Sequence, residues 1–256
     1  MLTSEKLVAE AAADILDRLR ARRPRVHCIT NAVAQNFTAN FLLAAGAVPS
    51  MTISREEVAA FVAGADALLI NLGTFDADRR KAAGIAIDAA ADKAIPWILD
   101  PVFIDRSSPR ADYARGLVRR RPAALRLNRA EFAALAGFEA EGGALTGYAR
   151  DQRIVIGLTG AIDHVTDGTR LATIENGHPL MGSVTAMGCA GSALVAACHA
   201  VEDDAFQATA AGLLMLGVAG EVAAQTARGP GSFAVAMLDA LHQLDRAQLL
   251  KNARVV

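Results

Sequence analysis

The sequence predicts an α/β protein with three layers, α/β/α, in which a mostly parallel central sheet has helices on both faces. Short apolar segments alternate with helical segments about six times along the 256 residues. Ala67–Asn71 is nearly all apolar, as a strand buried on both faces should be. Asp167-Gly168 lies between two short runs of strand type and predicts a hairpin. We expect one domain over residues 1–256.

The elements follow from hydrophobic spacing and from capping residues. Leu7, Ala11, Ile15 and Leu19 recur near the helical period, and Ser54 to Glu57 reads as a capping box. Expected strands lie at residues 26–30, 48–52, 67–71, 96–99, 123–127, 153–158, 164–166 and 170–174. Expected helices lie at residues 3–20, 35–45, 54–63, 78–93, 110–119, 128–137, 193–201, 204–227 and 233–244. The Gly-bearing segment 139–152 is expected to be a surface loop.

The composition excludes several classes of protein. Hydrophobic residues make up 53% of the chain, but the longest apolar run, Ala208–Gly220, is broken by Gly212 and Gly217. A bilayer needs about 20 apolar residues, so we expect a buried core helix and no membrane span. A net charge of −1 gives no reason to expect nucleic acid as a partner.

Cysteine usage and the first residues indicate the compartment. The three cysteines are an odd number at unrelated spacings, which argues against a disulfide framework or a metal knuckle. Residues 1–10 carry charges and no apolar core, so we expect no secretory leader. The expected location is the reducing cytoplasm.

A loop of small residues, Gly182–Ser192, leads directly into the apolar helical segment 193–201. Unpaired N–H groups and the dipole of such a helix make an anion site, and phosphate is the commonest small anion. Cys189 lies at the mouth of this site, where the same dipole would partly activate its thiol. The alternative is an ordinary junction with a buried cysteine.

Polar residues just after each strand are the next candidates, because ligands bind beyond the carboxyl ends of parallel strands. Two of them, Asp100 and Glu131, are carboxylates that would suit a Mg²⁺ held largely through water. Alternatively, Asp100 is a turn residue before Pro101, and Asn128 with Glu131 is a capping pair. The full set is Asn31, Met51, Gly73, Asp100, Asn128, Glu131 and Thr159.

Cysteine and histidine residues outside this set have simpler interpretations. His27 adjoins an apolar run and is expected to be a core histidine, and Cys198 and His199 lie too deep in their helix to reach the same ligand. No Cys-His-Asn signature accompanies Cys189. If the site binds phosphate, a Cys189 thiolate would instead stand where a general base belongs.

Ordered motifs at matching separations resemble the hydroxyethylthiazole kinase family, the thiamin-salvage branch of the ribokinase-like superfamily. The resemblance runs from about residue 25 to 244. The motifs are His27-Cys28-Ile29-Thr30-Asn31, Phe37-Thr38-Ala39-Asn40, Leu42-Leu43-Ala44, Gly46-Ala47 with Pro49-Ser50-Met51, Leu69-Ile70-Asn71-Leu72-Gly73-Thr74, Leu99-Asp100-Pro101-Val102, Thr159-Gly160, Gly188-Cys189 and Gly229-Pro230-Gly231-Ser232-Phe233.

The resemblance implies transfer of phosphate from ATP, with Mg²⁺, to the primary alcohol of 4-methyl-5-(2-hydroxyethyl)thiazole. It implies a homotrimer with thiazole pockets at subunit contacts. It assigns Cys189 to catalysis, at the position where most ribokinase-like enzymes place an aspartate. By the same resemblance, Met51, Asn31, Gly73 and Ala186 would bind substrate, Arg126, Thr159, Asn128 and Gly188 would bind ATP, and Asp100 and Glu131 would serve the metal.

The chain departs from the family pattern at four places. A glycine of the anion-hole motif is Ala186 here, and Met187 follows it with a side chain that could crowd the substrate. Leu127 puts a bulky residue where the family has glycine, expected near the triphosphate, and residues 103–106 replace small ones. Segment 137–153 looks too short for the helix that the family has there, which would leave one sheet face uncovered.

These departures leave two other readings open. One is a relative on the same scaffold with another substrate, such as a hydroxymethylpyrimidine or pyridoxal kinase or a nicotinamide-nucleotide repair dehydratase. The other is a thiazole- or nucleotide-binding protein that has lost turnover. Retention of Asp100, Glu131 and Cys189 together argues against the second reading.

Overall fold

A single sheet of eight strands organises the computed structural model, which describes residues 4–256. The strand order is β2-β1-β3-β4-β5-β6-β7-β8. Neighbours from β2 to β6 pair in parallel, and β6-β7 and β7-β8 pair antiparallel, so the predicted hairpin is confirmed. The strands are β1 (Arg25–Ile29), β2 (Val48–Ser50), β3 (Ala67–Asn71), β4 (Trp97–Asp100), β5 (Ala124–Asn128), β6 (Val155–Thr159), β7 (Asp163–Thr166) and β8 (Leu171–Ile174).

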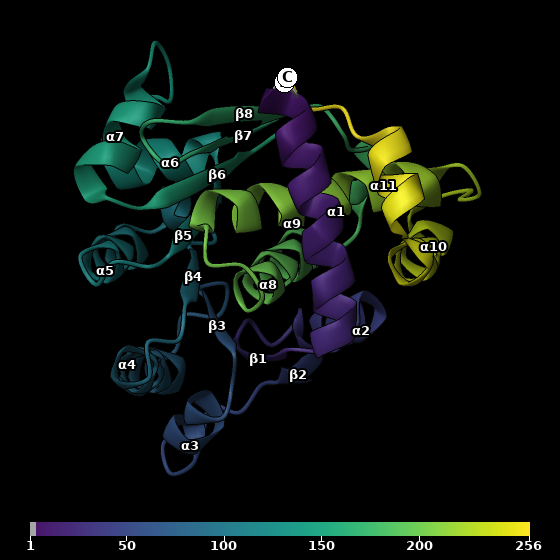
Figure 1. Cartoon of the computed structure of the whole chain (residues 1–256). Helices are drawn as coiled ribbons and strands as arrows, with labels where there is room; N and C mark the ends of the chain where they lie inside the picture. The colour runs from purple at the N-terminus through teal and green to yellow at the C-terminus, as the bar shows by residue number, and fades with distance from the viewer. Residues whose placement is uncertain (1–3) are drawn as a thin grey trace.

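Helices cover both faces of the sheet, which confirms the predicted three layers (Figure 1). One face carries α3 (Val58–Ala63), α4 (Ala77–Asp92), α5 (Ser108–Val118), α6 (Arg129–Ala136) and α7 (Ala144–Gln152). The other carries α1 (Ser4–Arg22), α2 (Gln35–Ala45), α8 (Met187–His199), α9 (Ala205–Ala224), α10 (Pro230–Gln243) and α11 (Arg246–Asn252). There are two short 3₁₀ turns among the described residues: η1 (Ile104–Arg106) follows β4, and η2 (Pro179–Ser183) precedes α8.

Each strand supplies both cores, because successive side chains point to opposite faces. On β3, Leu69 packs with α8 and its neighbours, whereas Leu68 and Ile70 pack with α3 and α4. On β4, Ile98 and Leu99 divide in the same way. Burial on both faces explains why these strands read as continuous apolar runs.

The predicted core helix is α9. It is long and apolar enough to cross a membrane by length and composition, but 78% of its most apolar window is buried inside the protein. It packs against α1, α8 and α10. The apolar run therefore fills the core, as the glycine interruptions had indicated.

Three local expectations are wrong. Segment 139–152 is not a loop, because it contains α7, and Leu145 and Ala149 bury one side of that helix while Tyr148 packs edge-on against Phe132. The chain is thus long enough for a helix here, and this face of the sheet is covered. The Ser54 capping box does not form, because Glu57 accepts a hydrogen bond from Thr52 Oγ1 at 2.6 Å and the helix begins only at Val58.

Other boundaries shift by a few residues. Residue 3, the expected start of the first helix, lies outside the described residues. α10 begins at Pro230 rather than 233, and α11 was not expected. Beyond α11, the backbone of Val256 exchanges hydrogen bonds with Thr173 at 2.8 and 3.0 Å, so the last residues extend the sheet beside β8.

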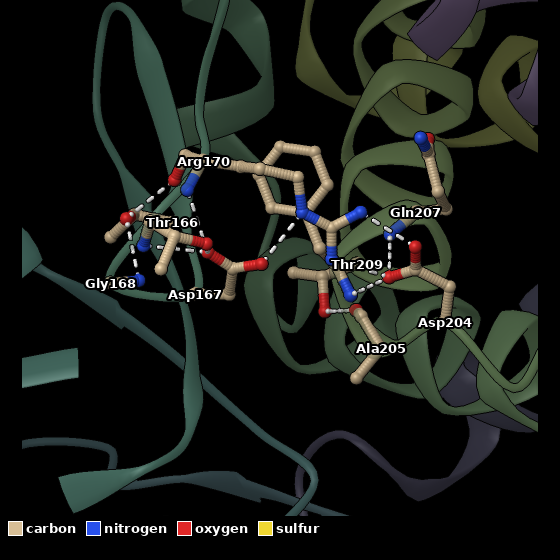
Figure 2. A network of polar contacts seen from close by, with 10 residues as sticks. Thr166, Asp167, Gly168, Arg170, Asp204, Ala205, Gln207 and Thr209 are labelled. Carbon is tan, nitrogen blue, oxygen red and sulfur yellow. Dashed lines mark hydrogen bonds and ion pairs between the residues drawn. The ribbon is translucent and has the colours of Figure 1, made fainter. Parts of the chain in front are cut away.

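An ion-pair network fastens the β7-β8 hairpin to the start of α9 (Figure 2). Arg170 donates to Asp167 at 2.6 Å and to both oxygens of Asp204 at 2.6 and 2.9 Å. Asp204 in turn caps α9 through the N–H of Phe206, whose ring lies 4.4 Å from the guanidinium carbon. The network therefore holds together two elements that both contribute to the cavity described below, the hairpin through Asp163 and α9 through Leu216 and Gly217.

Candidate functional site

The predicted site residues meet at one edge of the sheet, where the parallel strands end. Asn71 pairs with Asp100 across β3 and β4, and Asn128 pairs with Thr159 across β5 and β6. The start of α8 packs over the same region, since this helix contacts β1, β3 and β4. The arrangement produces two adjoining parts, a nucleotide-sized cavity and a buried polar cluster.

The cavity has a volume of about 590 Å³, and it gathers all four residues predicted to bind ATP. These are Arg126, Asn128, Thr159 and Gly188. Polar groups from β5 and β6 occupy one side, and apolar residues of η2, α8 and α9, such as Met181, Met187 and Leu216, form the other. A pocket with this division suits a ligand that has an apolar ring and a charged tail.

The Arg126 side chain occupies space that is open only because residue 188 is glycine. The guanidinium lies so close to the helix backbone that a Cβ added at Gly188 would be 2.9 Å from Nη1. Arg126 Nε is buried and has no hydrogen-bond partner among the described residues. A buried unpaired donor is costly, so this one indicates an acceptor that a ligand supplies.

A buried hydrogen-bond chain runs beside the cavity from Cys189 to Asp100. Asn31 Nδ2 donates to Cys189 Sγ at 3.1 Å and to Asn71 Oδ1 at 3.3 Å. Asn71 Nδ2 and Ser192 Oγ both donate to Asp100 Oδ2 at 2.7 Å. Gly73 packs against Asn31, with space for no side chain, because a Cβ there would lie 2.7 Å from that amide.

The expectation of an activated Cys189 thiolate is wrong. Burial raises the pKa of this thiol to about 11, and the charge of Asp100 raises it further, against the donors Asn71 and Asn31 and the charge of Arg126. The helix was expected to begin at residue 193 after a loop, but α8 begins at Met187, so Cys189 stands in its first turn, where desolvation outweighs the helix dipole. With a pKa of about 11, Cys189 is mainly a thiol at neutral pH.

The capping alternative is confirmed for Glu131, Asp100 ends strand β4, and the magnesium role of both carboxylates stays a prediction. Glu131 forms a capping box with Asn128, and its second oxygen accepts from the N–H of Phe103 at 3.0 Å. Asp100 is 2% exposed, and burial, together with the charge of Glu131, raises its pKa to about 6 against the opposing charge of Arg126.

A magnesium ion fits this donor set only if other ligands complete its shell. No group of three or more His, Cys, Asp or Glu side chains able to hold a metal occurs in the part of the chain that the structure describes. Two carboxylates with oxygen donors suit Mg²⁺, which keeps several waters and binds phosphates. The residues are therefore compatible with a metal that arrives with a nucleotide.

Two predicted substrate residues lie at the margins. Met51 follows the edge strand β2 and lines a separate open cavity of about 640 Å³ with residues 52–56 and Asp78. Ala186 precedes α8 in the left-handed conformation, with φ of 71°. Ala186 therefore adopts a conformation that glycine reaches without strain.

One of the sequence departures has a different consequence from that expected. Leu127 is fully buried in the core beneath α6 and does not approach the cavity, since alternate residues on β5 point to opposite faces. Met187 is also buried and forms part of the cavity wall. Phe103 is 49% exposed and adopts a φ of 59°, which is rare for an aromatic residue.

The histidines behave as core residues, as predicted. His27 is buried between Ser50 Oγ at 2.8 Å and the carbonyl of Thr52 at 3.0 Å, and His199 hydrogen-bonds Thr209. Sequence reasoning assigned no role to Asn71, Ser192 or Asp163, which lines the cavity and whose pKa burial raises to about 6. The sequence signal for Asn71 was its position at the polar end of an apolar strand, and the signal for Ser192 was a hydroxyl three residues after Cys189.

Fold and site together define a ribokinase-like small-molecule kinase, in which the first turn of α8 adjoins a cavity of about 590 Å³. The model of the hydroxyethylthiazole kinase family matches residues 16–247, and the chain belongs to that family. A probable hydroxyethylthiazole kinase from Agrobacterium fabrum is 45% identical over 247 residues, 96% of this chain and 95% of that protein.

Solved structures agree with this assignment. The hydroxyethylthiazole kinase protein of Pyrococcus horikoshii superposes with a TM-score of 0.91 at 37% identity, covering 96% of this chain and 98% of that one. A Bacillus subtilis pyridoxal kinase shares the fold alone, at 16% identity and a TM-score of 0.55, over 75% of this chain and 89% of that one.

The raised pKa of Cys189 predicts slow alkylation at neutral pH. Its labelling rate with iodoacetamide should climb with pH and show no plateau until the pH approaches 11, because only the thiolate reacts. Peptide mass spectrometry separates it from Cys28 and Cys198, which are fully buried. A plateau at or below pH 8 would contradict the assignment of a neutral thiol.

Substitution at Gly188 tests the nucleotide cavity. Gly188→Ala should raise the KM for ATP by about tenfold or more, because its Cβ displaces the Arg126 guanidinium. Gly182→Ala is the matched control, since Gly182 lines the same cavity but has open space around it. Equal ATP KM values for the two variants would remove Arg126 from the nucleotide site.

Proposed function

We propose that this chain transfers the terminal phosphoryl group of ATP to the primary alcohol of 4-methyl-5-(2-hydroxyethyl)thiazole in the cytoplasm, with residues 1–256 acting as one kinase domain. The carrying observation is that Arg126 packs over Gly188 while the next residue, Cys189, belongs to the buried polar cluster. The nucleotide cavity and the part of the site proposed to face the thiazole alcohol, here called the acceptor side, therefore meet at one turn of α8. Membership of the hydroxyethylthiazole kinase family supports the choice of acceptor.

Each residue has a defined task in this proposal. Arg126, Asn128 and Thr159 hold the nucleotide, and the N–H groups of Gly188 and Cys189 face the transferred phosphoryl group from the first turn of α8. Asp100 and Glu131 would hold Mg²⁺, which neutralises charge on the phosphates when bound. Asn31, Gly73 and Ala186 would line the acceptor side, and Met51, which lines a separate cavity in the single chain, would reach it from its margin.

Cys189 acts in this proposal through position and not through proton removal. A thiol with a pKa of about 11 is a poor base at pH 7. Phosphoryl transfer proceeds through a loose transition state in which positioning and charge neutralisation do most of the work. The Sγ atom, held by Asn31 at 3.1 Å, contributes a small neutral surface against which the alcohol can rest.

ADP release from ATP and Mg²⁺ tests the activity directly. We expect release that depends on hydroxyethylthiazole and not on hydroxymethylpyrimidine, pyridoxal or the absence of an acceptor. Release with another acceptor would establish a different kinase on this scaffold. Intact ATP binding without release for any acceptor would establish a binding protein.

The same assay, with Glu131→Gln beside the wild type, tests the metal role. This variant keeps the side-chain volume but removes the charge, so turnover should fall by about a hundredfold and demand more Mg²⁺. The melting temperature should fall by only a few degrees, because one capping interaction is worth about 1 kcal/mol. Unchanged Mg²⁺ dependence would contradict this role.

We also propose that the chain assembles as a homotrimer with active sites at the subunit contacts. Apolar side chains lie exposed along the edge strand and the neighbouring helix, with Val48 39% and Phe61 45% exposed beside a cavity of about 480 Å³. Met51 comes one residue after this edge strand, so a partner docked here would close the acceptor side.

Light scattering of the purified protein measures the assembly. The mass of one chain is 26.7 kDa, and we expect a particle of about three times that mass. Phe61→Glu should shift the particle toward a single chain, because a charge would then be buried at the contact. A monomer in the wild type would contradict the trimer.

A further inference from the structure

Asn71 connects the two halves of the proposed site. It is the last residue of β3, is 1% exposed, and lies opposite Asp100 in the parallel register. Its Nδ2 donates to Asp100 Oδ2 at 2.7 Å, and its Oδ1 accepts from Gly73 N at 3.0 Å and from Asn31 Nδ2 at 3.3 Å. One side chain therefore touches a proposed metal ligand and two residues of the acceptor side.

The amide can satisfy these partners in one orientation only. Asp100 requires a donor, whereas the N–H of Gly73 and the amide of Asn31 require an acceptor. A flipped amide would set donors against donors and an oxygen against a carboxylate. Aspartate has the same shape but no donor when ionised, and serine is too short to reach both sides.

The Asn31 side chain is held from two directions. Its Oδ1 accepts from Ala34 N at 2.9 Å, which leaves Nδ2 to divide between Asn71 and Cys189. Gly73 packs directly on this amide. A shift of Asn71 therefore moves Asn31, Gly73 and the surroundings of Cys189 relative to Asp100.

We propose that Asn71 is a positioning residue for phosphoryl transfer, which keeps the acceptor side in register with the carboxylate of Asp100. This inference rests on the proposed function and assigns no contact between Asn71 and substrate. The reacting alcohol and phosphate must be held about 3–3.5 Å apart, and a misplacement of about 1 Å can cost about a hundredfold in rate. Loss of this register therefore lowers the rate and weakens acceptor binding together.

Ser192 provides the matched comparison. It is fully buried and donates to the same oxygen, Asp100 Oδ2, at the same distance of 2.7 Å. Its hydroxyl also contacts the carbonyl of Gly188 at 3.3 Å, and within the described residues it makes no hydrogen bond to Asn31 or Gly73. Removing Ser192 weakens the hold on Asp100 and leaves the acceptor side intact.

The experiment compares steady-state kinetics of Asn71→Asp, Ser192→Ala and the wild type. Asn71→Asp should lower kcat and raise the KM for hydroxyethylthiazole, each by about tenfold or more, with the KM for ATP changed by less than about threefold. Ser192→Ala should lower kcat and leave the thiazole KM within about twofold. Melting temperatures confirm that each variant is folded.

An exchange variant completes the test. Asn71→Asp combined with Asp100→Asn restores a donor facing an acceptor with the direction reversed, and the aspartate still accepts from Gly73 and Asn31. The thiazole KM should return toward the wild-type value while kcat stays low, because the carboxylate has left position 100. Recovery of the thiazole KM without recovery of kcat indicates a positioning role. A general loss of stability would not restore the thiazole KM in the double variant.

Two results would overturn the inference. One is a thiazole KM that Asn71→Asp changes no more than Ser192→Ala does. The other is an exchange variant whose thiazole KM stays as poor as that of Asn71→Asp. In either case a wild type active on thiazole leaves the proposed function intact, whereas an inactive wild type removes the proposed function itself.

Discussion

The buried carboxylate of Asp100 is the group on which the rest of the site depends. Removing one donor from a buried charge costs several kcal/mol, so Asp100 has to be held by hydrogen bonds. Those bonds come from Asn71 on β3 and Ser192 on α8. The charge thereby ties the start of α8 to the sheet, and Cys189, one turn before Ser192, is held over the strand ends as a consequence.

The same burial decides the state of the thiol. The rise in the pKa of Cys189 from 9.0 to about 11 corresponds to about 3 kcal/mol, whereas a helix dipole supplies about 0.3–1 kcal/mol. Desolvation and the neighbouring negative charge therefore prevail over the helix. The charge of a buried carboxylate disfavours a second negative charge on Cys189, which supports the proposal that cations and N–H groups carry the chemistry.

The sequence predicts most of the fold because its strands are apolar on both faces and its helices carry local capping signals. It also predicts most of the residues that gather at the site, because these residues follow the strands directly and the end of each strand can be recognised from the local sequence. It cannot predict the state of Cys189, because burial and the charge of Asp100 come from segments almost 90 residues apart in the sequence. Asn71 was overlooked for the same reason, as its partners come from a neighbouring strand and two loops.

Two departures from the family pattern fall among the six described non-glycine residues with positive φ. Ala186 and Phe103 both adopt positive φ, which costs an L-residue about 1–2 kcal/mol. Hydrogen bonds hold both, from Ala190 N to the carbonyl of Ala186 at 2.8 Å and from Phe103 N to Glu131 at 3.0 Å. The loops before α8 and after β4 therefore supply the site with backbone geometry. Ala186 and Phe103 thus both adopt conformations that glycine reaches without strain, and the hydrogen bonds from Ala190 and to Glu131 offset part of the cost.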